Sequence, residues 1–136
     1  MKKIKNLAII AFCVLMLCAV GAMNAFAYEY PYPAEGEIVA EEIDGNTYKY
    51  FLFEGNAVIY RARVKGDVTV PDILGGCTVK GIFEDAFTNN DELIGITIPG
   101  SIEYIGKSAF DSCRSLKKVV MLEGVKVIDD FAFDTY

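Results

Sequence analysis

In three short stretches of the chain every second residue is apolar, and the residue between varies in type. They read VTVP from Val68, ITIP from Ile96 and VVML from Val119. A period of two predicts β-strands with one face turned into a core. The residues expected to point inward are Val68, Val70, Ile96, Ile98, Val119 and Met121. Those expected to point outward are Thr69, Thr97 and Val120.

The segments that follow these stretches repeat at a constant spacing. Three sets recur every 23 positions: Ile82, Ile105 and Ile128; Ala86, Ala109 and Ala132; Phe87, Phe110 and Phe133. A period in the twenties is typical of a solenoid, because one unit cannot bury its apolar face until it stacks on the next. We expect columns of isoleucine and phenylalanine and parallel strands about 4.8 Å apart. The repeats are assigned to residues 68–93, 94–116 and 117–136.

The first repeat contains extra residues between its strand and its isoleucine. The sequence there is DILGGC, centred on Gly75 and Gly76. Paired glycines predict a turn, and an insertion of this kind should bulge from one face of a solenoid.

A hairpin is predicted before the repeats. Two β-rich runs, residues 47–53 and 57–64, flank Glu54-Gly55-Asn56. We interpret residues 46–67 as a cap that covers the first open edge of the stack and is not itself a repeat. Residues 28–45 contain YEYPYPAEGE, show no periodicity and are interpreted as a flexible linker. An adhesive tyrosine-proline tip is the alternative.

The N-terminal segment, 1–27, has the pattern of a signal peptide. Three lysines precede an apolar run from Leu7 to about Met23, and Ala25-Phe26-Ala27 follows. Small residues at these positions predict cleavage after Ala27 and secretion to the extracellular space or cell envelope. An uncleaved membrane anchor is the alternative, for which the run is short.

Charge and cysteine content narrow the partners. Loss of the leader would shift the formal net charge from −6 to −9, because the leader carries three lysines and no acids. This negative net charge disfavours nucleic acid and anionic membranes as partners.

The cysteines that remain after loss of the leader are Cys77 and Cys113. Export permits a disulfide between them, but they occupy different places in their repeats. We expect Cys113 to be buried in the core and Cys77 to lie in a loop.

The residues from Leu93 to Leu116 carry a family resemblance. They read LIGITIPGSIEYIGKSAFDSCRSL. This resembles the unit L-x-x-I-x-I-P-x-x-V-x-x-I-G-x-x-A-F-x-x-C-x-x-L of the BspA-like leucine-rich repeats of bacterial surface proteins. The resemblance extends over about residues 46–136, although the chain holds fewer than three full units. It implies an α/β, β-dominant repeat solenoid with parallel strands, secretion or surface display, adhesion or protein binding, and no catalytic residues.

The residue types required for common enzyme mechanisms are scarce. The chain contains no histidine, which excludes Ser-His-Asp and Cys-His nucleophile pairs. Two cysteines are too few for a structural zinc site. The acidic clusters at residues 41–44 and 129–130 lack the spacing of a calcium loop and are interpreted as solvated surface. We therefore predict no enzyme activity, no cofactor and no metal.

Two surfaces remain as candidates for function. The first is a protein-binding face formed by Thr69, Gly95, Thr97, Lys118 and Val120. The second is a self-association edge formed by Met121, Phe131, Phe133 and Tyr136, where an uncovered apolar edge favours pairing. Tyr48, Tyr50, Tyr60 and Tyr104 are either packing residues or surface contacts, and Tyr104 breaks its column. A third interpretation is a remnant of a longer array without its own ligand.

Overall fold

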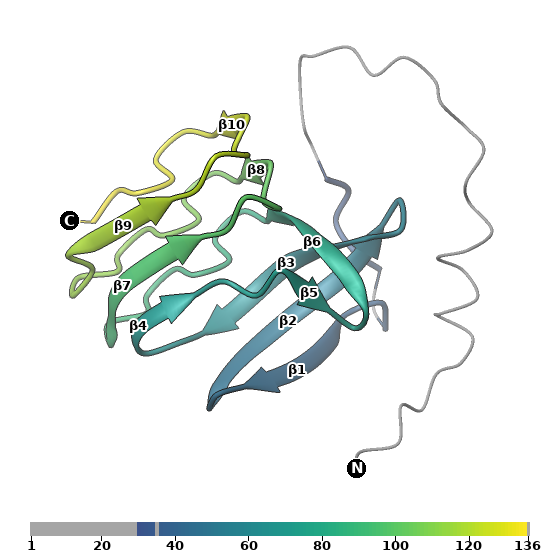
Figure 1. Cartoon of the computed structure of the whole chain (residues 1–136), viewed down its shortest axis with the longest axis horizontal. Coiled ribbons are helices and arrows are strands. Elements are labelled where there is room, and N and C mark those ends of the chain that lie inside the picture. Colours follow the sequence, from purple (N-terminus) through teal and green to yellow (C-terminus); the bar gives the residue numbers. More distant parts are fainter. Residues whose placement is uncertain (1–29, 35, 136) are drawn as a thin grey trace.

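The computed structural model describes residues 30–34 and 36–135, and the predicted leader and Tyr136 lie outside them. The described residues form strands and turns and contain no helix. A seven-stranded sheet has the order β1-β2-β3-β6-β8-β10, with β5 paired to β6, and a second sheet has the order β4-β7-β9. The prediction of a β-dominant repeat solenoid is confirmed. Figure 1 shows that the order of β4, β7 and β9 follows the chain.

The smaller sheet contains the three strands predicted from the alternating stretches. They are β4 (Gly66–Thr69), β7 (Leu93–Ile98) and β9 (Lys118–Met121), and all pair in parallel. Thr69 lies opposite Thr97, and Thr97 lies opposite Val120. The predicted register is therefore correct.

The larger sheet forms a second side of each coil. Its parallel strands are β3 (Asn56–Arg63), β6 (Cys77–Ile82), β8 (Tyr104–Ile105) and β10 (Val127–Ile128). Ile82 lies opposite Ile105, which lies opposite Ile128. The predicted isoleucine column is thus present in the backbone register.

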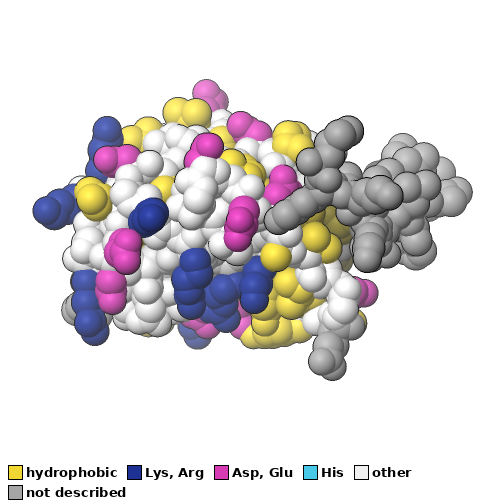
Figure 2. Space-filling view, turned by 90° about the horizontal axis from the view of Figure 1, so that it is seen from below, with side chains coloured by type: hydrophobic (Ala, Val, Ile, Leu, Met, Phe, Trp, Pro, Cys, Tyr) yellow, Lys and Arg dark blue, Asp and Glu magenta, His cyan; other side chains and the backbone are white. Residues whose placement is uncertain are grey.

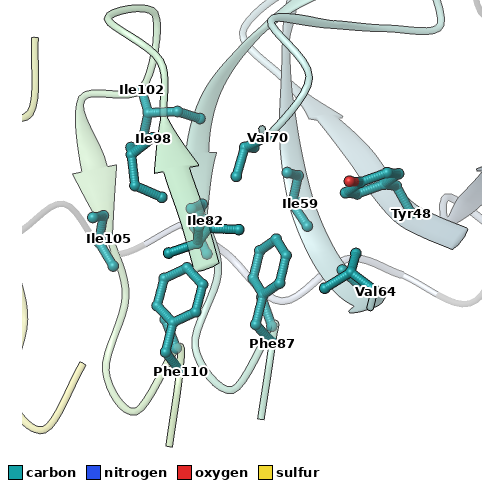
Figure 3. Packing of buried hydrophobic residues seen from close by; sticks show 14 of the residues in the cluster. Tyr48, Ile59, Val64, Val70, Ile82, Phe87, Ile98, Ile102, Ile105 and Phe110 are labelled. Atoms are coloured by element: carbon teal, nitrogen blue, oxygen red, sulfur yellow. The ribbon is translucent and has the colours of Figure 1, made fainter. Parts of the chain in front are cut away.

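Turns close the third side of each coil. The amide of Phe87 donates to the carbonyl of Ala109 at 2.7 Å, and the amide of Phe110 donates to that of Ala132 at the same distance. The aromatic rings stack in parallel with this ladder. The ring centroids of Phe87 and Phe110 are 4.8 Å apart, and those of Phe110 and Phe133 are 4.9 Å apart. Figure 3 shows Phe87 and Phe110 side by side beneath the isoleucine column.

Each turn requires a residue in the left-handed backbone region. Equivalent positions of successive coils have a φ of 54° at Asp85, 51° at Ser108 and 57° at Phe131. Short polar residues tolerate this region because their side chains bond locally, whereas bulky residues are strained there. Phe131 therefore occupies a backbone position that suits short polar residues such as Asp85 and Ser108 in the earlier coils.

A buried polar position supports the turns of the first two coils. Asn90 is 4% exposed and donates to the carbonyls of Ala62 and Phe87, while its carbonyl accepts from the amide of Val64. Cys113 takes the equivalent place in the next coil, is fully buried and donates to the carbonyl of Phe87 at 3.1 Å. The prediction of a core position for Cys113 is correct, and it forms no disulfide.

The N-terminal region is more ordered than the sequence suggests. A flexible linker is predicted over residues 28–45, but β1 (Val39–Ile43) pairs antiparallel with β2 (Asn46–Phe53), and Tyr30 is only 9% exposed. The linker prediction is wrong over these described residues. Pairing of β1 with β2 and burial of the Tyr30 ring order the segment, although its sequence shows no periodicity.

The predicted hairpin is present, but it is also part of the stack. Strands β2 and β3 pair antiparallel, and β3 then pairs in parallel with β6. Ile59 lies opposite Ile82 and precedes it by the same spacing that separates Ile82 from Ile105. The interpretation that this unit is not a repeat is therefore wrong for β3, which extends the isoleucine column by one coil.

The insertion in the first repeat folds as a small hairpin. Strand β5 (Ile73–Leu74) pairs antiparallel with the start of β6. At its tip the amide of Gly75 donates to the carboxylate of Glu41 at 3.0 Å, so the insertion contacts β1. Cys77 begins β6 and pairs with Leu74, so its predicted place in a loop is wrong.

Candidate functional site

The predicted binding face lies on the outer side of the β4-β7-β9 sheet. Two rows cross the three strands in register. One row is Asp67, Gly95 and Lys118, and the other is Thr69, Thr97 and Val120. The structure therefore brings the five predicted residues together on one face.

Asp67 is a member of this face that the sequence reasoning missed. A Cβ placed on Gly95 would contact the Asp67 carboxylate, so that carboxylate lies over the glycine, and Lys118 flanks the same glycine on the other side. Asp67 precedes Val68 as Gly95 precedes Ile96, and this alignment was the available signal. The face thus carries an acid at one side and a base at the other.

These rows line a shallow groove of about 250 Å³. Its walls are Asp67, Val68, Thr69, Gly95, Ile96, Thr97 and Lys118. Val68 and Ile96 point into the core and are 7% and 1% exposed, so the groove presents mainly hydroxyl groups, backbone and the two charges. Such a surface suits a polar partner surface better than a deeply inserted apolar ligand.

A column of charged side chains lies two residues before the isoleucine column in each of three coils. The Lys80 Nζ atom lies 2.8 Å from Glu103 Oε1, and the Lys126 Nζ atom lies 2.7 Å from Glu103 Oε2. Successive members of this column are again 23 positions apart. Hydrogen bonds from Lys126 and Lys80 lower the pKa of Glu103. The column links three coils through one carboxylate.

The surface carries mixed charges. On the face shown in Figure 2, Lys and Arg side chains lie among Asp and Glu side chains, and hydrophobic side chains gather towards one end. Among residues 30–34 and 36–135, no three side chains of metal-binding type converge. Within the same residues, no helix has the length and apolarity needed to span a bilayer.

The end of the last coil exposes apolar side chains. From the predicted self-association edge, Met121 is 42% exposed and Phe131 is 62% exposed. Phe133 is half-buried because it stacks on Phe110, and Tyr136 lies outside the described residues. The same end also exposes Val119, Leu122, Val127 and Ile128. The alternation predicts that Val119 and Met121 point into a buried core. In the structure, the burial of these two side chains is incomplete.

The tyrosines are mostly packing residues. Tyr48 and Tyr50 are 2% and 5% exposed, and burial raises the pKa of Tyr48 to about 12. The sequence allows Tyr104 to be a surface residue, but it is 7% exposed. Burial, followed by a 3.0 Å hydrogen bond to Asp129, raises the pKa of Tyr104. Of the two alternatives, packing therefore holds for Tyr104, because Tyr30 packs against its ring.

Comparison with known proteins agrees with this architecture. The family model described as "BspA type Leucine rich repeat region (6 copies)" matches residues 71–136. This repeat region belongs to the BspA-type leucine-rich repeat family. A solved leucine-rich repeat protein from Bacteroides capillosus is 26% identical in sequence. The match has a TM-score of 0.60 and covers 69% of this chain and 73% of that protein. No curated protein is significantly similar to the chain.

The match of residues 71–136 to this family indicates a broad functional class. Leucine-rich repeats are protein-interaction modules, and BspA-type repeat proteins are typically secreted or displayed at a surface. Solenoids of this kind bind partners through extended surfaces that run across several coils. The β4-β7-β9 face also runs across several coils, since each of its rows takes one residue from each of three coils.

Proposed function

We propose that the protein is a secreted, non-enzymatic protein-binding module that captures its partner on the β4-β7-β9 face. One observation carries this proposal: Asp67, Gly95 and Lys118 form a row beside Thr69, Thr97 and Val120, and the rows line one groove. The leader pattern of residues 1–27 supports export. Adhesion to a surface, or contact with a host protein, would use the same face.

The arrangement of charge indicates the kind of contact. Asp67 and Lys118 flank Gly95, so a partner segment that presents a base and an acid at matching separation would pair with both. The threonine hydroxyls can each donate and accept a hydrogen bond. Because the groove is shallow, we expect shape-dependent and salt-sensitive binding.

A substitution at the centre of the face tests the proposal. Thr97→Asp adds a carboxylate beside the row that contains Asp67 and should weaken partner capture from the native environment by about tenfold or more. The melting temperature should change by about 2 °C or less, because the side chain is not in the core. Thr135→Asp, at an exposed threonine that belongs to neither row of the face, is the matched control. Equal capture by both variants would refute the assignment of the face.

A second candidate function rests on the end of the last coil. Phe131 combines 62% exposure with a left-handed φ of 57°, at a position where the earlier coils have Asp85 and Ser108. Folding alone does not favour an exposed, strained aromatic residue. We infer that this end associates with a further coil contributed by a second copy, as in a structural or self-associating unit.

Phe131→Asp isolates this second function. Aspartate is the residue of the first coil at this position, so the turn should keep or gain stability while the apolar contact is lost. Light scattering over a concentration series should show association in the wild type and a monomer in the variant. A wild-type monomer at every concentration would contradict self-association and leave the binding face unaffected.

A further inference from the structure

The outer side of the larger sheet carries a second row of residues in register. Phe51, Val58, Gly81, Tyr104 and Val127 lie opposite one another across five strands. Gly81, Tyr104 and Val127 are the equivalent residues of three successive coils. Two of these three positions carry large side chains, so the backbone of this column accepts them. Gly81 also has no positive φ that would require glycine.

Tyr30 explains the glycine. A Cβ added to Gly81 would meet three atoms of the Tyr30 side chain: Cε2 at 2.6 Å, the hydroxyl oxygen at 2.7 Å and Cζ at 2.8 Å. The side chain missing at Gly81 is therefore replaced by the ring of Tyr30. This ring is only 9% exposed although it lies far from the repeats in the sequence.

Aromatic rings complete the recess around Tyr30. Its ring centroid lies 5.4 Å from Tyr104, 5.5 Å from Phe53 and 6.5 Å from Phe51, and each pair is arranged edge to face. Such geometry is the preferred one for aromatic pairs and is specific for a ring. We refer to Gly81, Phe51, Phe53 and Tyr104 as the tyrosine socket.

The segment that fills the socket has a defined chemistry. Residues Tyr30-Pro31-Tyr32-Pro33, which we call the arm, alternate rings with prolines. Proline lacks an N–H and fixes φ, so the arm cannot form a ladder with the sheet and favours a stiff extended conformation. Tyr32 is 70% exposed, yet its ring centroid lies 5.1 Å from that of Phe83. The arm thus contacts the sheet through its rings, as proline-rich peptides contact aromatic grooves.

We propose that the tyrosine socket is a docking site for tyrosine–proline peptides, and that the arm is its ligand in cis. A peptide of the same chemistry binds in trans when the arm leaves. The short connection to β1 gives the arm an effective concentration in the millimolar range, so the arm competes strongly with any peptide in solution. This site lies on a different sheet from the proposed binding face and does not depend on it.

The first test uses the full chain and a fluorescent synthetic peptide of residues 28–34, YEYPYPA. Fluorescence anisotropy should show that the Tyr30→Ala protein binds this peptide about tenfold or more tightly than the wild type does, because its socket is vacant. Adding Gly81→Val, which copies the residue of the last coil, should abolish binding. A peptide in which Tyr30 is alanine should not bind, whereas one in which Tyr32 is alanine should retain most of its affinity.

Four outcomes would overturn the proposal. Three concern the peptide: no binding by a folded Tyr30→Ala protein, equal binding after Gly81→Val, or binding that survives loss of the peptide's Tyr30. The fourth is a wild-type dimer that dissociates on Tyr30→Ala, because the socket would then hold the arm of a second copy.

A second measurement applies even if Tyr30→Ala does not fold. Gly81→Ala adds only the Cβ that meets the Tyr30 ring. It should release the arm, so that the ring-current-shifted aromatic NMR signals of Tyr30 move to positions typical of solvent. Val127→Ala, in the same column, is the matched control and should leave these signals unchanged. Unshifted signals in Gly81→Ala would show that the glycine does not form the socket.

Discussion

The second and third coils carry nearly the same apolar residues but differ in burial. Ile105 is fully buried, whereas Ile128, its counterpart in the next coil, is 48% exposed. Ile96 and Ile98 are at most 1% exposed, whereas their counterparts Val119 and Met121 are 39% and 42% exposed. The difference shows that a side chain in a solenoid is buried by the coil that follows it as much as by its own.

The largest expected effect separates the two isoleucines of this comparison. Ile105→Ala should destabilise the protein by about 2–5 kcal/mol, because it leaves a cavity between two coils. Ile128→Ala should cost about 1 kcal/mol or less, because half of that side chain already contacts solvent. Chemical denaturation of the two variants measures both values. Equal losses would show that coverage by a following coil does not govern stability here.

A smaller effect is expected at the polar position of the turns. Asn90→Ala leaves the buried amide of Val64 without its side-chain acceptor and should cost about 1–3 kcal/mol. Cys113→Ala removes one weak thiol donor and a small volume and should cost about 1 kcal/mol. Thermal unfolding of both variants makes the comparison. A greater loss for Cys113→Ala would contradict the hydrogen-bond account of this column.

The smallest effect concerns the charged column that links the coils. The pKa of Glu103 is lowered in the folded state, so its contribution is present above its unfolded pKa of about 4.3 and is lost as the pH falls through the folded value. Lys80 and Lys126 are 36% and 63% exposed, which screens the column. Glu103→Gln should therefore cost about 0.5–1 kcal/mol at neutral pH.

Denaturation at several pH values checks this prediction. The stabilities of the wild type and Glu103→Gln should converge as the pH falls below about 4.3, and added salt should also reduce their difference at neutral pH. A difference that persists in acid would exclude the ion pairs as its cause. Lys118→Gln, on the other sheet, serves as a control that leaves this column intact.

The interior of the repeats could be predicted from the sequence because its causes are local and periodic. The spacing of Ile82, Ile105 and Phe110 predicted columns that the register and the ring stacking confirm. The alternation around Thr97 predicted which residues share the outer face of β7. The constant repeat spacing and the alternation of two are both properties of a single chain, and parallel stacking follows from them.

The positions of the N-terminal arm and of the residues at the edge of the binding face could not be predicted in this way. They depend on contacts between segments that are distant in the sequence. The sequence around Tyr30 contains no periodic pattern from which the position of its ring above Gly81 could be predicted. The space above Gly81 exists only after β6 and β8 have paired. The repeat alignment places Asp67 in the same row as Gly95, but the position of its carboxylate over Gly95 follows only from the pairing of β4 with β7. The residue pattern alone thus determined the solenoid, its register and its core columns. Only the tertiary structure decided which side chains the neighbouring coils and the arm cover, because burial depends on what packs from outside each coil.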